Sequence, residues 1–235
     1  MKDQMIYAEK LSKMVQCETI SVPDVPNTEK FDKFHKLLEE LFPLVFSKGE
    51  VHYIDSSLLI KWKGKGKAEP ILLMSHQDVV PAEGEWKYPP FSGEIKEDRI
   101  WGRGTVDTKG SLMCIFQSIE ELMEEEYIPE GDVYIASSST EEVAGSGAPK
   151  TVEWLKEHNV RLQFLMDKGT GNIKVIAHST GGHASAPEKN TPIARLSAFI
   201  NDIETKNPNK LEFTPTVLEM FKRLGPQAKG VLGFA

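Results

Sequence analysis

The chain has 235 residues, of which 40% are hydrophobic and 27% charged, and this length fits one large domain or one domain and part of another. A formal net charge of −7, without any basic cluster, argues against a nucleic-acid-binding surface. The N-terminal sequence lacks an apolar core of signal-peptide length and no later segment could span a bilayer, so we expect a cytoplasmic protein without a membrane or nucleic-acid partner.

Two amphipathic helices are predicted in the N-terminal part of the chain. Apolar residues recur at helical spacing over 5–15 and again over 31–42, and the Asn-Thr pair at 27–28 supplies a cap for the second helix. Two cysteines cannot form a disulfide framework. Because Cys17 and Cys114 both lie in apolar helical patterns, we expect buried, reduced thiols.

Strand-like runs follow: "EVHYI" at 50–54, "SLLIKW" at 57–62 and "ILLMS" at 71–75. The Gly/Lys stretch "KGKGK" between the last two predicts a hairpin turn. A long helix is predicted from about Lys109 to Glu125. Its inner face consists of five apolar residues at helical spacing: Leu112, Ile115, Phe116, Ile119 and Leu122.

The next segments continue the alternation of strands and helices. "VYIASSS" at 133–139 is strand-like, "APKTVEWLKEH" is helical, and "LQFLMD" at 162–167 is another strand. Strands that alternate with helices in this order are typical of an α/β fold with parallel central strands. We therefore predict a mixed, mainly parallel sheet flanked by helices.

The character of the sequence changes from about Lys168. "NIKVIAHST" alternates like a half-exposed strand, "NTPIARLSAFINDIE" is an amphipathic helix, and a further helical stretch lies near 217–224. This pairing predicts the start of a second, α+β unit. We place the first domain at 1–168 and the partial second domain at 169–235.

Polar residues gather where the predicted strands end. Ligands of open parallel sheets bind outside the carboxyl ends of the strands. The glycine-rich turn "IWGRGTVDTKG" delivers a further carboxylate at the start of the long helix. One histidine and five carboxylates are therefore expected at one edge of the sheet: His76, Asp78, Asp107, Glu141, Glu142 and Asp167.

Such a cluster favours a metal site. Neighbouring carboxylates raise each other's pKa unless a cation neutralises them, and one or two divalent ions would do so. Imidazole plus carboxylates suits zinc, and also manganese or cobalt. His76 is then a ligand and Asp78 orients its ring, although a strand-end histidine bonded to a carboxylate would explain His76 by itself. In the Glu141–Glu142 pair, one side chain can face the metal and the other a bound water.

Five ordered motifs, "HQDVVP", "EWKYPPFSGEI", "IWGRGTVDTKG", "STEEVAGSGA" and "GGHASAP", resemble those of the M20 metallopeptidases. The carboxypeptidase S-like and N-acyl-amino-acid hydrolase branch is nearest. The resemblance implies a zinc-peptidase-like catalytic domain, followed by a partial lid or dimerisation domain. It also implies two divalent metal ions held by four ligands: His76, Asp107 as the bridge, Glu142 and Asp167.

The same resemblance assigns the remaining roles. Glu141 is similar to the family's general base, and Asp78 to the residue that supports His76. His183 is similar to a histidine that reaches a substrate in the partner subunit's site, so a homodimer is implied. The implied reaction is hydrolysis of an amide bond in peptides or N-acyl amino acids with a free carboxylate.

Three departures from the family pattern are evident. Thr108 stands where members usually have a second Asp, but that position is not a ligand. A stretch that follows Asp167 in the family, and a histidine ligand far downstream, have no counterpart here, so we expect the natural protein to be longer.

Two alternative functions remain. One is a non-catalytic amino-acid or peptide binder on the same fold, against which the retention of Glu141 counts. The other is a deacetylase or desuccinylase of the same family.

Overall fold

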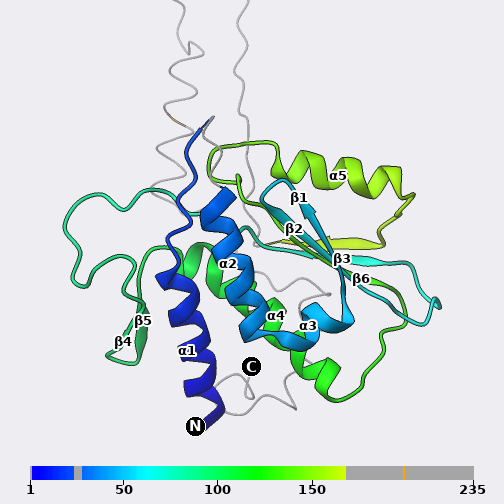
Figure 1. Ribbon diagram of the computed structural model, residues 1–235, viewed down its shortest axis with the longest axis horizontal. Coiled ribbons are helices and arrows are strands. Elements are labelled where there is room, and N and C mark those ends of the chain that lie inside the picture. The colour runs from blue at the N-terminus through cyan, green and yellow to red at the C-terminus, as the bar shows by residue number, and fades with distance from the viewer. Residues whose placement is uncertain (1, 24–27, 168–197, 199–235) are drawn as a thin grey trace, which may run out of the picture. The chain divides into compact units, whose positions relative to one another are not determined.

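The computed structural model describes residues 2–23, 28–167 and 198 (Figure 1). The chain divides into two units, Met1–Thr170 and Gly171–Ala235, and the elements below all belong to the first. The strand and helices expected after Lys168, with the lid domain they would form, lie outside the described residues. The boundary between 168 and 169 therefore stays a prediction. None of the helices in the described ranges is long and apolar enough to cross a membrane.

A five-stranded mixed sheet forms the centre of the first unit, with strand order β1-β2-β6-β3-β7. β3 pairs in parallel with β6 and β7, whereas β1 with β2 and β2 with β6 are antiparallel. The predicted α/β fold with a mixed sheet is confirmed. The strands are β1 (Glu50–Ile54), β2 (Ser57–Trp62), β3 (Ile71–Met74), β6 (Val133–Ser137) and β7 (Phe164–Met166).

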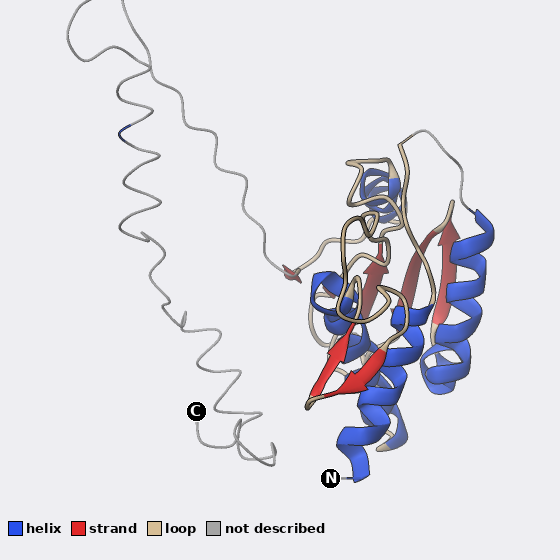
Figure 2. Cartoon of the chain, turned by 90° about the vertical axis from the view of Figure 1, so that its left-hand side faces the viewer, coloured by secondary structure: helices blue, strands red, loops and turns tan. Residues whose placement is uncertain are grey.

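Helices cover both faces of this sheet (Figures 1 and 2). Successive strand residues point to opposite faces, so Leu58 and Ile60 of β2 pack with four helices while Leu59 packs on the other side. The larger core contains side chains from α1 (Lys2–Gln16), α2 (Thr28–Leu41), α3 (Pro43–Lys48) and α4 (Gly110–Glu124). The smaller core is closed by α5 (Gly147–Glu157), through Leu155.

Short elements complete the unit. β4 (Glu94–Lys96) and β5 (Arg99–Trp101) form a separate antiparallel hairpin, and the π-helical turn η1 (Thr105–Lys109) leads into α4. The N-terminus of α3 has no side-chain cap of its own. Instead the buried carboxylate of Glu120 in α4 accepts the backbone N–H groups of Leu44 and Val45, at 3.0 and 2.9 Å.

The hairpin turn predicted at "KGKGK" is wrong, because β6 lies between β2 and β3 in the sheet. The segment instead runs beside the loop before β6, where the N–H groups of Lys65 and Lys67 donate to the carbonyls of Pro129 and Glu130. A Cβ atom on Gly64 would lie 2.2 Å from a backbone oxygen of that loop. The glycine therefore permits a close approach of two backbones and does not mark a reversal of the chain.

Two details of the predicted burial in α4 also differ. Leu122 is 36% exposed, whereas Met123 is buried. With about 100° of rotation per residue, Met123 returns to within about 20° of Leu112 and Leu122 does not. Cys114, predicted to be buried, is exposed because it follows Leu112 by two residues, about 200° around the helix. Cys17 is partly buried, and both thiols are free.

Candidate metal centre

The parallel strands carry the predicted polar residues to one edge of the sheet. Beyond the end of β3, the N–H of Ser75 donates to the carbonyl of Ala136 at 3.1 Å, and that of Gln77 to Ser138 at 2.8 Å. β7 pairs in parallel on the other side of β3. The segments after β3, β6 and β7 therefore leave the sheet side by side.

Three side chains form a group with metal-ligand spacing. One ligand atom from each of His76, Asp107 and Glu142 lies within 4.8 Å of the other two. The His76 side chain is buried, whereas the Asp107 side chain is 62% exposed, so the group opens toward solvent. Glu141 lies beside it, with Oε2 3.7 Å from His76 Nε2. Sequence reasoning predicted that these four residues come together, and the structure places them so.

Both ring nitrogens of His76 face oxygen atoms. Nδ1 is 2.9 Å from the backbone oxygen of Asp78 and 3.3 Å from its Oδ1, while Nε2 is 3.0 Å from Asp107 Oδ1. A neutral imidazole has one N–H. If that N–H is at Nδ1, then Nε2 directs a lone pair at a carboxylate, an arrangement that a cation between them would stabilise. The donor set therefore fits a divalent metal ion.

The electrostatics of Glu142 support the same fit. Burial raises the pKa of its carboxyl group, and the neighbouring carboxylates Asp107, Asp78 and Glu141 raise this pKa further, although His76 opposes them. Several acidic groups that disfavour one another's charge need a compensating cation. A divalent ion held by these residues would reverse the shift.

Asp78 is the structural centre of the site. Its side chain is fully buried, and the Ser21 hydroxyl donates to Oδ2 at 2.7 Å. The backbone N–H groups of Glu141 and Glu142 donate to Oδ1 and Oδ2 at 3.1 and 3.0 Å. Burial by itself would raise the pKa of Asp78, but the hydrogen bonds from His76, Ser21 and Glu142 hold it below its ordinary value. One carboxylate thus orients both His76 and the turn that carries the two glutamates.

Sequence reasoning missed three residues that support this arrangement: Ser21, Gln77 and His35. The side-chain oxygen of buried Gln77 accepts a hydrogen bond from His35 Nε2 at 2.8 Å, and its amide nitrogen donates to the backbone oxygens of Ser56 and Ser137. The sequence did contain a signal for Gln77. It lies between His76 and Asp78 at the end of a strand, where successive side chains point to opposite faces of the sheet, so its polar side chain faces away from theirs. Ser21 and His35 are distant in sequence, and no local pattern marked them.

Asp107 lies in η1, which departs from helical geometry. Asp107 and Thr108 have non-helical φ/ψ values, and the peptide bond between them is cis. Gly104 precedes the turn with φ +84°, where a Cβ atom would lie 2.6 Å from Val79. The Ser75 hydroxyl, at the end of β3, donates to the carbonyl of Thr108 at 3.2 Å. The turn is therefore tied to the strand that carries His76.

Two further predicted site residues are Asp167 and His183. Asp167 follows β7 at the same edge of the sheet and is exposed, but its carboxylate is not among the three groups that lie within 4.8 Å of one another. His183 lies outside the described residues. The predicted roles of both remain predictions.

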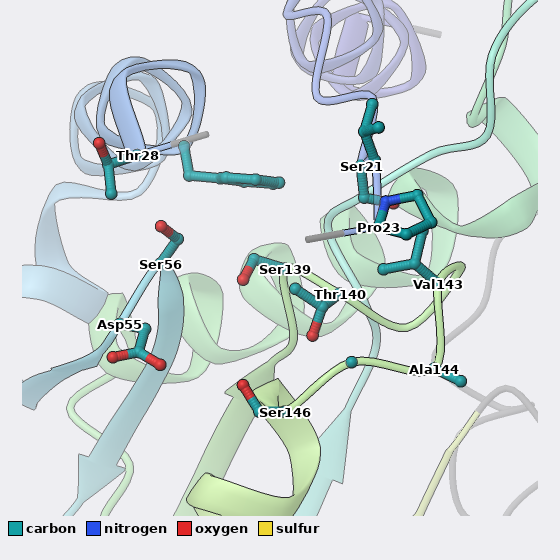
Figure 3. Close-up of a pocket in the computed structure, with 13 residues that line it drawn as sticks. Ser21, Pro23, Thr28, Asp55, Ser56, Ser139, Thr140, Val143, Ala144 and Ser146 are labelled. Atoms are coloured by element: carbon teal, nitrogen blue, oxygen red, sulfur yellow. The ribbon is translucent and has the colours of Figure 1, made fainter. Parts of the chain in front are cut away.

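A pocket of about 740 Å³ borders the turn that carries the glutamates (Figure 3). Thr140 and Val143 line it on either side of the pair, and Ser21 and Phe31 line another part. Its volume falls within the range of small-molecule sites.

A smaller pocket of about 300 Å³ includes Asp107 in its lining. The indole rings of Trp86 and Trp101 and the side chain of Arg103 contribute to its lining. The guanidinium of Arg103 lies 5.0 Å from the ring centre of Trp86, which is a cation–π distance. Space for a ligand therefore exists next to Asp107 of the candidate metal centre.

Residues 72–223 match the family described as Peptidase family M20/M25/M40. The chain is 31% identical over 252 aligned positions to a probable carboxypeptidase S-like 2 of Dictyostelium discoideum, which covers 92% of this chain and 49% of that protein. It is also 31% identical to the human N-fatty-acyl-amino acid synthase/hydrolase PM20D1, over 95% of this chain and 50% of that one. The chain thus spans about half the length of these curated relatives.

The fold has counterparts among solved structures. The crystal structure of an M20 family metallo-carboxypeptidase, Sso-CP2 from Sulfolobus solfataricus, superposes with a TM-score of 0.58. The match covers 70% of this chain and 37% of the Sulfolobus protein at 22% identity, and it shows that the two share a fold.

Proposed function

The chain belongs to Peptidase family M20/M25/M40, and we propose that it carries the metal-dependent amide-hydrolysing site of a peptidase or amidohydrolase. The substrates that we propose are small peptides or N-acyl amino acids with a free carboxylate. The observation that carries this proposal is the group formed by His76, Asp107 and Glu142, with Glu141 beside it. Three ligand side chains next to an accessible carboxylate are what hydrolysis with an activated water requires.

The residues that would hold the metal are His76, Asp107 and Glu142, with Asp167 as a further ligand. We propose that these residues would hold two divalent ions, with zinc as the first candidate and manganese or cobalt as alternatives. Bound divalent metal supplies Lewis acidity, which polarises an amide carbonyl and lowers the pKa of water.

Glu141 is the proposed general base. Its side chain is 40% exposed, so the carboxylate can reach both solvent and a bound substrate. The hydrogen bond from its own N–H to Asp78 fixes the backbone from which the side chain extends. We propose that Glu141 takes a proton from the attacking water and passes it to the nitrogen of the leaving amine.

The substrate class rests on the relatives and on the shape of the site. The names of the two relatives refer to a carboxypeptidase and to an enzyme of N-fatty-acyl amino acids. The smaller pocket, which includes Asp107, could accept the part of a substrate next to its scissile amide. A deacetylase or desuccinylase would use the same centre and differ in the acyl group. A binder without activity is disfavoured, because it has no use for Glu141.

Two further features of the proposal concern the whole protein. We propose a homodimer in which His183 acts at the partner's site, and a cytoplasmic location. The first derives from the motif that contains His183, which lies outside the described residues, and the second from the composition of the sequence.

The proposal is tested by removing and restoring the metal. The protein is treated with a chelator, dialysed, and assayed on an N-acyl amino acid and on the same compound with its carboxylate converted to an amide. Activity should disappear with the metal, return with Zn²⁺, Mn²⁺ or Co²⁺, and be much lower on the neutral compound. Glu141→Gln serves as the control for contaminating hydrolases. Activity that survives in the metal-free protein, or equally in Glu141→Gln, would refute the proposal.

A further inference from the structure

Lys109 is a buried cation two residues beyond Asp107. Its side chain is fully buried, and its Nζ donates to the carbonyl oxygens of Met14 and Cys17 at 3.0 and 2.6 Å. The ring centre of Phe34 in α2 lies 5.0 Å from the amine. Within the described part of the chain, the amine is matched by carbonyls and a ring face, and by no carboxylate.

Burying a charge without a counter-ion is unfavourable for folding. Burial lowers the pKa of Lys109 to about 8, which shows how strongly the environment disfavours the charged form. An apolar side chain of similar length would fill the same space without this cost. The contacts with the last carbonyls of α1 compensate in part, because a cation interacts favourably with a helix C-terminus.

The position of Lys109 in η1 indicates what these contacts achieve. Because Asp107 and Thr108 depart from helical geometry, the turn lacks the regular hydrogen bonds of an α-helix. It is held on one side by the bond from Ser75 to Thr108 and closed by the bond from Lys109 N–H to the carbonyl of Gly104. On the other side, the Lys109 amine ties it to the end of α1.

The end of α1 continues directly into the segment that supports Asp78. The backbone oxygen of Cys17 accepts a hydrogen bond from the Lys109 amine, and two residues later the hydroxyl of Thr19 donates to the backbone oxygen of Gln77 at 2.6 Å. Ser21 then donates to the Asp78 carboxylate. Three hydrogen bonds, joined by the short backbone segment 17–21, therefore connect the turn of Asp107 with the partner of His76.

We propose that Lys109 is a positioning residue that sets the distance between Asp107 and the His76–Asp78 pair, and thereby the affinity of the site for metal. Lys109 does not touch the substrate or the metal in this account. It acts through the α1 terminus and the η1 turn. This inference rests on the proposed metal-dependent function.

The test compares Lys109→Met with Glu120→Gln, measured in the full chain. Glu120 is the matched control, because it is also a buried charged residue whose partners are backbone groups. These partners are the N–H groups of Leu44 and Val45, away from the site. Glu120→Gln should be less stable than the wild type, because one of its two acceptor oxygens is lost. Lys109→Met loses the two hydrogen bonds of the amine and also the cost of burying its charge, so the readout is metal affinity and not stability. Only Lys109→Met should bind Zn²⁺ or Co²⁺ more weakly, by roughly 10-fold or more in a titration of the metal-free protein well below its melting temperature. Glu120→Gln should keep the wild-type Kd for metal.

A wild-type Kd for metal in folded Lys109→Met would overturn the proposal, as would an equal loss in Glu120→Gln. If Lys109→Met does not fold, Lys109→Gln is measured against the same criteria. If neither folds, Lys109 is a stability residue and the proposal is rejected.

A second readout separates this inference from the proposed function. Crystal structures of the metal-free wild type and of Lys109→Met are compared. In the variant, the distance between Asp107 Oδ1 and His76 Nε2 should exceed the 3.0 Å found here. An unchanged separation would contradict the positioning role. A wild-type protein that binds no divalent metal would refute the proposed function, while the crystal comparison would still decide the role of Lys109.

Discussion

The substitution Asp78→Asn tests whether one buried carboxylate organises the site. The Asp78 side chain accepts hydrogen bonds from the Ser21 hydroxyl and from the N–H groups of Glu141 and Glu142, and it also faces His76 Nδ1. Asparagine has the same shape but offers one carbonyl oxygen in place of two. Its NH₂ group must therefore face at least one donor.

The magnitude follows from these contacts. A buried N–H that loses its acceptor costs about 1–3 kcal/mol, and bonds to a charged acceptor are each stronger than neutral ones. We expect Asp78→Asn to lose about 2–4 kcal/mol of unfolding free energy. The turn that carries Glu142 and the ring of His76 lose their common support. Metal affinity should therefore fall about 10- to 100-fold, as for other groups that orient ligands.

The assay combines urea unfolding of the metal-free protein with a metal titration. Ser21→Ala is the control, since it removes one donor and leaves the carboxylate in place. It should cost about 1 kcal/mol and weaken metal binding clearly less than Asp78→Asn does. An Asp78→Asn protein with wild-type stability and wild-type metal affinity would show that Asp78 does not organise the site.

Two other predictions concern His35 and His183. Burial lowers the pKa of His35 in the folded protein below the ordinary histidine value of 6.5. As the pH falls below 6.5, the unfolded chain therefore binds a proton at His35 before the folded protein does. The stability of the wild type should then decline relative to that of His35→Gln, and urea midpoints that fall in parallel below pH 6.5 would contradict this sign. Mixed His183→Ala and Glu141→Gln chains should regain partial activity if His183 acts across a dimer, because one hybrid site is then intact. Inactivity after demonstrated subunit exchange would exclude that role.

Local patterns predicted most of the elements and the residues of the metal group. The apolar runs of β2, β3 and β6 and the spacing of α4 reflect burial, which is a property of each segment by itself. The polar residues after β3 and β6 stood out because they interrupt apolar strands. Their convergence followed from the parallel pairing of those strands.

The errors have a different origin. "KGKGK" has the composition of a turn, but whether two strands pair depends on what lies between them in the sheet, and β6 arrives about 70 residues later in the sequence. Ser21 and Lys109 act through partners 57 and 92–95 positions away in the chain. Single serines and lysines are ordinary surface residues, so no local pattern predicts that these two are buried.

The metal content of Glu142→Gln and Glu141→Gln, measured beside turnover, tests the central claim most directly. Glu142→Gln should bind less metal than the wild type and regain part of its activity in excess metal, because it lacks a charged ligand. Glu141→Gln should retain the wild-type metal content while its turnover falls by roughly 10²–10⁴-fold, because it cannot accept a proton. Wild-type metal content in Glu142→Gln, or metal loss confined to Glu141→Gln, would contradict the assignment of ligand and base.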